Sequence, residues 1–183
     1  MLTIGDRLPA FRLRAAGPEA EPGMPLPELT DESFPGQWKL LFFWPKDFTF
    51  VCPTEILGFD AAFEEFAARN CAIIGASTDT DAVHVAWRLS RADLGRVRFP
   101  WLADHNKRLA SALGILDPAE GVARRATFLV DPDNIIRFVY VTDDGVGRSP
   151  EEVLRVLDAL QTGALCPCGW KPGDETIDPK RAA

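Results

Sequence analysis

The stretch from residue 45 to residue 55 constrains the fold more than any other part of the chain, because it joins two elements of different type. The residues before it, 40–44, form an apolar run that is typical of a buried strand. The residues after it place apolar side chains at spacings of 3, 4 and 3 positions, the helical period: Ile56, Phe59, Phe63 and Phe66. The pattern predicts a strand, a short connection and a helix, with Cys52 in the first turn of the helix.

A cysteine in the first turn of a helix has special surroundings. Backbone N–H groups there lack intrahelical partners, and the helix dipole adds partial positive charge. Such surroundings favour thiolate over thiol, which suits a nucleophilic role for Cys52. The alternative is that Cys52 only fills the core, as many free cysteines do. Position alone does not decide between the two interpretations.

The neighbours of Cys52 favour the nucleophilic interpretation. Pro45 cannot continue a strand ladder, and Pro53 suits the first turn of a helix. Thr49 lies three residues before Cys52, where a turn would place its hydroxyl beside the sulfur. The same hydroxyl is equally suited to cap the helix, which is the commoner role of such a threonine.

Length and composition bound the class of protein. The chain has 183 residues, 46% apolar and 26% charged, which predicts one globular domain with a substantial core. A net charge of −7 argues against a nucleic-acid-binding surface, which needs clustered positive charge. No run of apolar residues is long enough to predict a membrane span. The first residues lack a basic segment followed by an apolar one, so we expect a cytoplasmic location.

The chain has four cysteines: Cys52, Cys71, Cys166 and Cys168. In a reducing compartment they indicate catalytic or transient disulfides rather than a structural framework. Zinc is the other use of clustered cysteines, but only one residue separates the last two, where zinc sites usually have two to four. Neither His84 nor His105 stands at ligand spacing from that pair. We therefore expect no metal site.

The rest of the chain alternates between strand and helix patterns. Strands are expected at residues 71–77, 99–102, 126–130 and 135–141, with a short edge strand or hairpin arm around residues 11–14. Helices are expected at residues 81–92 and 106–113 and from residue 150 onward. Asp79 or Thr80 caps the first of these, Gly114 ends the second, and Ser149 caps the third. This order predicts a thioredoxin-like α/β fold, a mixed central sheet flanked by helices.

We expect two parts in the chain. Residues 1–162 would form the thioredoxin-like domain, and residues 163–183 a C-terminal tail. The tail is rich in proline and glycine, which predicts a mobile segment. It carries Cys166 and Cys168, which no core needs.

The stretch around Cys52 resembles a known family. Pro45, Thr49 and Cys52 fall on the Pro-x-x-x-Thr-x-x-Cys motif of peroxiredoxins, thiol peroxidases that reduce hydroperoxides. Residues 42–55, Phe-Phe-Trp-Pro-Lys-Asp-Phe-Thr-Phe-Val-Cys-Pro-Thr-Glu, resemble the alkyl hydroperoxide reductase C-subunit (AhpC) branch, of the typical two-cysteine type. The likeness covers nearly the whole chain. It implies reduction of hydrogen peroxide and organic hydroperoxides without a cofactor, in antioxidant defence and redox homeostasis.

The resemblance assigns roles around the sulfur. Cys52 would be the peroxidatic cysteine, Thr49 would hydrogen-bond the peroxide oxygens, and Pro45 would wall the pocket. Arg125 opens Arg-Ala-Thr-Phe-Leu-Val-Asp, which resembles the arginine at the start of a central strand in this family. A guanidinium suits negative charge because it is always charged and forked. Its neighbour Arg124 lies one residue out of register, so we expect it on the surface.

Glu55 and Arg148 have supporting roles by resemblance, whereas Cys71 has none. Glu55 and Arg148 look like the carboxylate and guanidinium that orient the residues touching the sulfur, although by spacing alone both are ordinary surface charges. Cys71 opens an apolar strand and is expected to be a buried, inert thiol.

The tail cysteines are expected to resolve the oxidised Cys52. Leu165-Cys166-Pro167 resembles the resolving Val-Cys-Pro of the family, and Cys168 matches an extra cysteine of a mycobacterial-like branch. The resemblance implies a Cys52–Cys166 disulfide between two subunits of an antiparallel homodimer, with dimers able to assemble into a ring. The reductant would be a protein dithiol: thioredoxin, an AhpD-like protein or a flavoprotein partner.

Two other functions compete with this interpretation. A thioredoxin-like disulfide oxidoreductase is disfavoured, because Glu55 stands where a CxxC motif would place its second cysteine. The second competing function is that of a holdase or scaffold whose thiols are incidental. Such a function could also coexist with peroxide reduction in the same protein.

Overall fold

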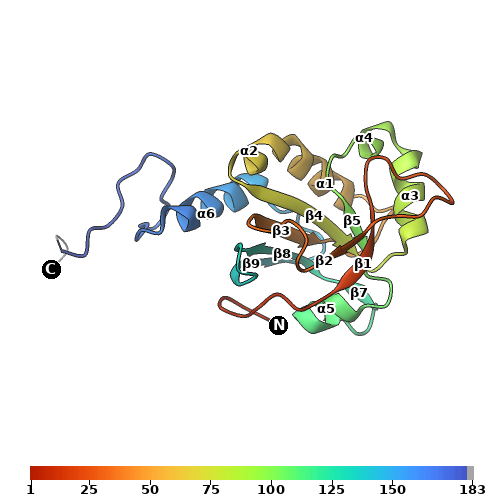
Figure 1. Cartoon of the computed structure of the whole chain (residues 1–183), viewed down its shortest axis with the longest axis horizontal. Coiled ribbons are helices and arrows are strands. Elements are labelled where there is room, and N and C mark those ends of the chain that lie inside the picture. Colours follow the sequence, from red (N-terminus) through yellow and green to blue (C-terminus); the bar gives the residue numbers. More distant parts are fainter. Residues whose placement is uncertain (181–183) are drawn as a thin grey trace. The chain divides into compact units, whose positions relative to one another are not determined.

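The computed structural model describes residues 1–180 and divides the chain into two compact units. The first unit is Met1–Arg148, and the second begins at Ser149. The sheet lies in the first unit, and the second contains one helix and the C-terminal segment (Figure 1).

The first unit is built on a seven-stranded sheet with the order β2-β1-β5-β4-β3-β8-β9. The strands are β1 (Arg12–Ala16), β2 (Glu28–Thr30), β3 (Trp38–Phe43), β4 (Cys71–Ser77), β5 (Trp101–Ala103), β8 (Arg125–Val130) and β9 (Ile136–Thr142). The three central strands β3, β4 and β5 run parallel, and the other pairs are antiparallel. The predicted mixed sheet is confirmed, including the hairpin of β1 with β2 at one edge.

The helices of the first unit are α1 (Cys52–Ala61), α2 (Phe63–Ala68), α3 (Asp81–Ser90), α4 (Ala92–Gly95) and α5 (Arg108–Leu113). The single helix expected after Cys52 is two helices that meet at Ala62. Phe63 is consequently only half-buried, with the guanidinium of Arg98 4.6 Å above its ring. The sequence patterns missed α4 and the small hairpin of β6 (Leu116–Asp117) with β7 (Val122–Ala123), which are too short for a periodic signal.

Strand β3 is buried on both faces, because successive side chains of a strand point to opposite sides. Phe42 packs against Phe59 of α1, with ring centroids 4.5 Å apart. Leu41 and Phe43 belong to the cluster on the other face, which includes Leu109 of α5. Figure 1 shows α1 and α2 on one side of the sheet and α5 on the other. This double burial accounts for the unbroken apolar run of residues 40–44.

Local signals placed several element ends correctly. Thr80, rather than Asp79, caps α3, because its hydroxyl accepts a hydrogen bond from Val83 N. Gly114 ends α5 in the left-handed conformation, with φ of 72°.

The second unit begins with α6 (Pro150–Thr162), and the Ser149 hydroxyl caps it by accepting from Glu152 N, as predicted. After the helix, Leu165 and Ile177 form an isolated antiparallel bridge, and Trp170 Nε1 donates to the Asp174 carbonyl at 3.1 Å. The described part of the tail therefore has internal contacts. Over residues 1–180, no helix is both long and apolar enough to cross a membrane.

Candidate active site

Cys52 is the first residue of α1 and is almost completely buried, with 1% of its surface exposed. The predicted position at the start of a helix is therefore confirmed. Val51 occupies the N-cap position, and no side chain caps the helix. The alternative in which Thr49 caps it is wrong, because the Thr49 hydroxyl instead donates to the Lys46 carbonyl at 3.0 Å. The first-turn N–H groups thus keep their positive end near the sulfur.

The connection between β3 and α1 is anchored by a buried carboxylate that the sequence analysis missed. Asp47 Oδ1 accepts from Trp44 Nε1 at 2.7 Å, and Asp47 Oδ2 lies 2.7 Å from Nδ1 of the buried His84. Burial raises the pKa of Asp47, although the contacts with His84 and Trp44 oppose that rise. Pro45, at the start of this connection, is also buried. The Asp47–His84 pair fixes the half of the connection that follows β3.

Arg125 reaches Cys52 from the first residue of β8. Its Nη1 lies 3.6 Å from Cys52 Sγ, and its side chain is buried. Arg124 instead pairs with Asp117 at 3.3 Å and leaves 55% of its side chain exposed. The structure thus brings to the sulfur the arginine that the resemblance indicated, and leaves its neighbour on the surface.

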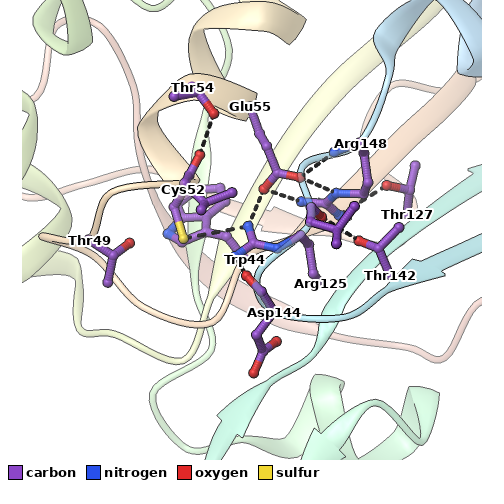
Figure 2. Close-up of polar contacts among 12 residues, drawn as sticks. Trp44, Thr49, Cys52, Thr54, Glu55, Arg125, Thr127, Thr142, Asp144 and Arg148 are labelled. Atoms are coloured by element: carbon purple, nitrogen blue, oxygen red, sulfur yellow. Dashed lines mark hydrogen bonds and ion pairs between the residues drawn. The ribbon is translucent and has the colours of Figure 1, made fainter.

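Glu55 lies one turn after Cys52 in α1, and its carboxylate binds two buried arginines (Figure 2). Its Oε1 accepts from Arg148 N at 2.9 Å and Arg148 Nε at 2.7 Å. Its Oε2 accepts from Arg148 Nη2 at 2.9 Å and also from Arg125 Nη1. Spacing alone makes Glu55 and Arg148 surface charges, and that interpretation is wrong because both are buried.

The charged side chains around the Cys52 sulfur have a net positive charge, which only a negatively charged sulfur would cancel. Burial lowers the pKa of Arg148, whereas for Arg125 the charge of Glu55 and the contact with Cys52 outweigh burial and raise the pKa. Two guanidinium groups and one carboxylate leave one excess positive charge in a buried place. A Cys52 thiolate would neutralise it, and buried charges are tolerated when they are paired. The site is therefore suited to a nucleophilic sulfur with fixed donors beside it.

Three further contacts of these arginines, two of them with backbone carbonyls, come from groups that no sequence motif marks. Arg125 Nη2 donates to the backbone carbonyl of Asp144 at 2.7 Å. Arg148 Nη1 donates to the Ala126 carbonyl at 2.8 Å and the Thr127 hydroxyl at 3.0 Å. Backbone carbonyls carry no residue signature, so only the folded chain identifies them as parts of the site.

The two tail cysteines, Cys166 and Cys168, lie in the second unit, and all four thiols of the chain are free. Cys166 is half-buried four residues after the end of α6, with its sulfur 3.5 Å from the Thr162 hydroxyl, and Cys168 is exposed. Among residues 1–180, no group of three or more His, Cys, Asp or Glu side chains is arranged to hold a metal ion.

Cys71 is expected to resist alkylation. It is buried at the start of β4, and burial raises the pKa of its thiol to about 12. The thiol should therefore stay neutral and protected at pH 8, whereas the exposed Cys168 should react. Iodoacetamide treatment of the reduced, folded protein followed by peptide mass spectrometry should find Cys71 unmodified, and the same treatment in denaturant should label it. Labelling of Cys71 as fast as Cys168 in the folded protein would contradict this.

Comparison with known proteins agrees with this geometry. Residues 4–139 match the model of the AhpC/TSA family, and residues 159–182 match the C-terminal domain of 1-Cys peroxiredoxin. Alkyl hydroperoxide reductase C of Mycobacterium tuberculosis is 48% identical over 97% of this chain and 94% of its own. The solved structure of Mycobacterium tuberculosis AhpC is 46% identical, with a TM-score of 0.84 over 93% of this chain and 99% of that one.

A solved structure from a eukaryote has the same fold. Reduced Plasmodium vivax 2-Cys peroxiredoxin has a TM-score of 0.89, with 32% identity over 96% of this chain and 93% of that one. The fold is therefore the thioredoxin-like fold of the peroxiredoxins, as predicted. With the family model matched over most of its length and these relatives matched nearly end to end, the chain belongs to the AhpC/TSA family, in the AhpC branch of the typical two-cysteine peroxiredoxins.

Proposed function

We propose that Cys52 carries out the peroxide reduction of this enzyme. Relatives of the chain are named alkyl hydroperoxide reductase C, thioredoxin peroxidase and peroxiredoxin, and as a member of their family it is a thiol peroxidase of peroxide detoxification. The observation that supports Cys52 is the Arg125 Nη1 atom 3.6 Å from its sulfur, at the start of a helix. Hydrogen peroxide and organic hydroperoxides are the proposed substrates.

The first step is a displacement on oxygen. The Cys52 thiolate attacks one oxygen of the hydroperoxide, so that a sulfur–oxygen bond forms and the oxygen–oxygen bond breaks. The electron pair leaves on the second oxygen, which takes up a proton and departs as water or alcohol, and the sulfur remains as sulfenic acid. Arg125 donates to the oxygen that becomes negative, the Thr49 hydroxyl orients the peroxide, and Pro45 shields the pocket. Glu55 and Arg148 hold Arg125 in place.

The second step forms a disulfide between two subunits. The thiol of Cys166 in the second subunit attacks the sulfenic sulfur of Cys52, a disulfide forms, and water leaves. Cys168 can then attack the Cys166 sulfur, so that a Cys166–Cys168 disulfide forms, the Cys52–Cys166 bond breaks and Cys52 leaves as a thiolate. Because a single residue separates the two tail cysteines, this disulfide is strained, and the covalent dimer stays the main product until the reductant removes the exchanged disulfide. In this proposal residues 1–162 are the peroxidase domain, residues 163–183 are the tail that reaches the partner, and homodimers can assemble into a ring.

A protein dithiol returns both cysteines to thiols by exchange. Thioredoxin, an AhpD-like protein and a flavoprotein partner all supply the required pair of electrons. A cytoplasmic location fits this chemistry, because the cytoplasm maintains such dithiols in reduced form. No metal or organic cofactor takes part, since the two electrons come from thiols.

One equivalent of hydrogen peroxide is expected to oxidise the reduced protein to a covalent dimer. Thiol titration should show two thiols lost for each peroxide consumed, and a non-reducing gel should show the dimer band. Cys52→Ser should consume no peroxide and form no dimer. The double change Cys166→Ser/Cys168→Ser should consume peroxide and form no dimer, while Cys168→Ser alone should keep the band.

Other results of this experiment would assign the resolving role to another cysteine or a different function to the protein. Cys166→Ser protein that dimerises at the wild-type rate would assign the resolving role to Cys168. Wild-type protein that loses no thiols to peroxide would be a scaffold, and reduction of insulin without peroxide turnover would indicate a disulfide oxidoreductase.

A further inference from the structure

A short turn after β9 contributes one contact to the site from outside the cysteine motif, the Asp144 carbonyl that accepts from Arg125. Thr142, the last residue of β9, lies directly opposite Arg125 in the β8–β9 ladder. Residues 143–147 then form an exposed turn that leads to Arg148. Figure 2 labels Thr142 and shows the Asp144 carbonyl bonded to Arg125.

The Thr142 side chain closes this turn. Its Oγ1 donates to the Val146 carbonyl at 2.9 Å, and Val146 N donates to the Asp143 carbonyl at 2.9 Å. Asp143 Oδ1 in addition accepts from Asp144 N at 2.9 Å. Residues 143–147 are exposed, and so is the Thr142–Val146 hydrogen bond, whereas the bond from Arg125 to the Asp144 carbonyl is partly buried. The Thr142 hydroxyl is the side-chain group that links Val146, on the far side of the turn, to the last residue of β9.

The closed turn contacts Arg125 and leads directly into Arg148. At its tip, the Asp144 carbonyl accepts from Arg125 Nη2 at 2.7 Å. Directly after it, Arg148 N donates to Glu55 Oε1 at 2.9 Å. A shift of the turn therefore moves the carbonyl that holds Arg125 and the backbone that holds Glu55.

The contact from the turn decides how the Arg125 guanidinium is rotated. Nη1 is shared between Glu55 and the Cys52 sulfur, while Nε has no hydrogen-bond partner among residues 1–180. The Asp144 carbonyl therefore fixes the edge of the guanidinium that Glu55 does not hold. Without it, Nη1 can keep its bond to Glu55 while the plane turns away from the sulfur.

We propose that Thr142 is a positioning residue for peroxide reduction, which acts through the turn and Arg125 rather than by touching the peroxide. The inference rests on the proposed function of Cys52 and Arg125. It predicts that the hydroxyl of Thr142, and not merely its volume, sets the reactivity of Cys52.

Thr142→Val removes the hydroxyl and keeps the shape. The second-order rate constant with hydrogen peroxide should fall roughly three- to tenfold, the size expected when one neutral hydrogen bond is lost. The pH midpoint of Cys52 alkylation should move upward, because the guanidinium no longer stays beside the thiolate. The rate at which the sulfenic acid becomes a disulfide should not change. Stopped-flow fluorescence and pH-dependent alkylation measure these quantities.

Two variants separate positioning from a general structural role. Thr142→Ser keeps the hydroxyl and should restore the rate and the midpoint. Ser33→Ala removes a hydroxyl that closes a different turn, by accepting from Thr30 N at 2.9 Å, and should leave both values unchanged.

The inference is overturned if Thr142→Val reacts within twofold of the wild type, if Thr142→Ser is as slow as Thr142→Val, or if the rate falls while the midpoint stays fixed. Wild-type protein that fails to consume peroxide would instead overturn the proposed function, so the two failures are distinguishable.

Discussion

Arg125→Ala is expected to slow the reaction with hydrogen peroxide about 10²–10³-fold, the usual cost of removing one preorganised donor from an active site. The charge that lies 3.6 Å from Cys52 Sγ disappears, so both the thiolate and the developing negative charge on oxygen lose their partner. Alkylation of Cys52 should also require a higher pH. Glu55 keeps its contacts with Arg148, so the protein should still fold. Stopped-flow kinetics and pH-dependent alkylation measure the two effects.

Arg124→Ala is the matched control, because it removes the same side chain one residue away. Arg124 pairs with Asp117 on the surface and should be nearly neutral in both assays. Arg125→Lys keeps the charge but loses the fork that contacts Glu55 and the Asp144 carbonyl together, so it should recover only part of the rate. Equal and small effects of Arg124→Ala and Arg125→Ala would remove Arg125 from the mechanism.

Glu55→Ala is expected to destabilise the protein by about 3–5 kcal/mol, because it leaves two buried guanidinium groups without their shared carboxylate. The three side chains are almost completely buried, so water cannot replace the lost contacts. For a domain of this size the melting temperature should fall by roughly 6–20 °C. The peroxide reaction should slow as well, since Arg125 loses one of its holding points. Urea unfolding followed by circular dichroism measures the free energy of unfolding.

Glu64→Ala is the control for an exposed carboxylate in an ion pair. Glu64 accepts from Arg98 at 2.9 Å but leaves 79% of its side chain exposed, so its removal should cost at most about 1 kcal/mol. If Glu55→Ala unfolds at the same urea concentration as Glu64→Ala, the buried carboxylate does not hold the two arginines together in solution.

The sequence by itself determined the local frame of the active site. The apolar run of residues 40–44 and the helical spacing after Cys52 placed the cysteine at a strand-to-helix junction. Thr80, Gly114 and Ser149 marked helix ends correctly, because caps depend on backbone conformation within a few residues. Resemblance added Arg125, which no spacing argument would have separated from Arg124. It also added Glu55 and Arg148, which by spacing alone are ordinary surface charges.

Only the tertiary structure decided how the charged and polar groups around the sulfur are buried and paired with one another. Glu55 lies 70 positions from Arg125 and 93 from Arg148, and Asp47 lies 37 positions from His84. No periodicity links residues so far apart, and each taken alone has the pattern of a surface group. The contacts of the Asp144 carbonyl and of the turn closed by Thr142 are harder still to predict from the sequence, because a backbone carbonyl is the same in every residue. Helix periodicity and caps are local properties of the chain, whereas a buried charge cluster exists only after packing has excluded water around it.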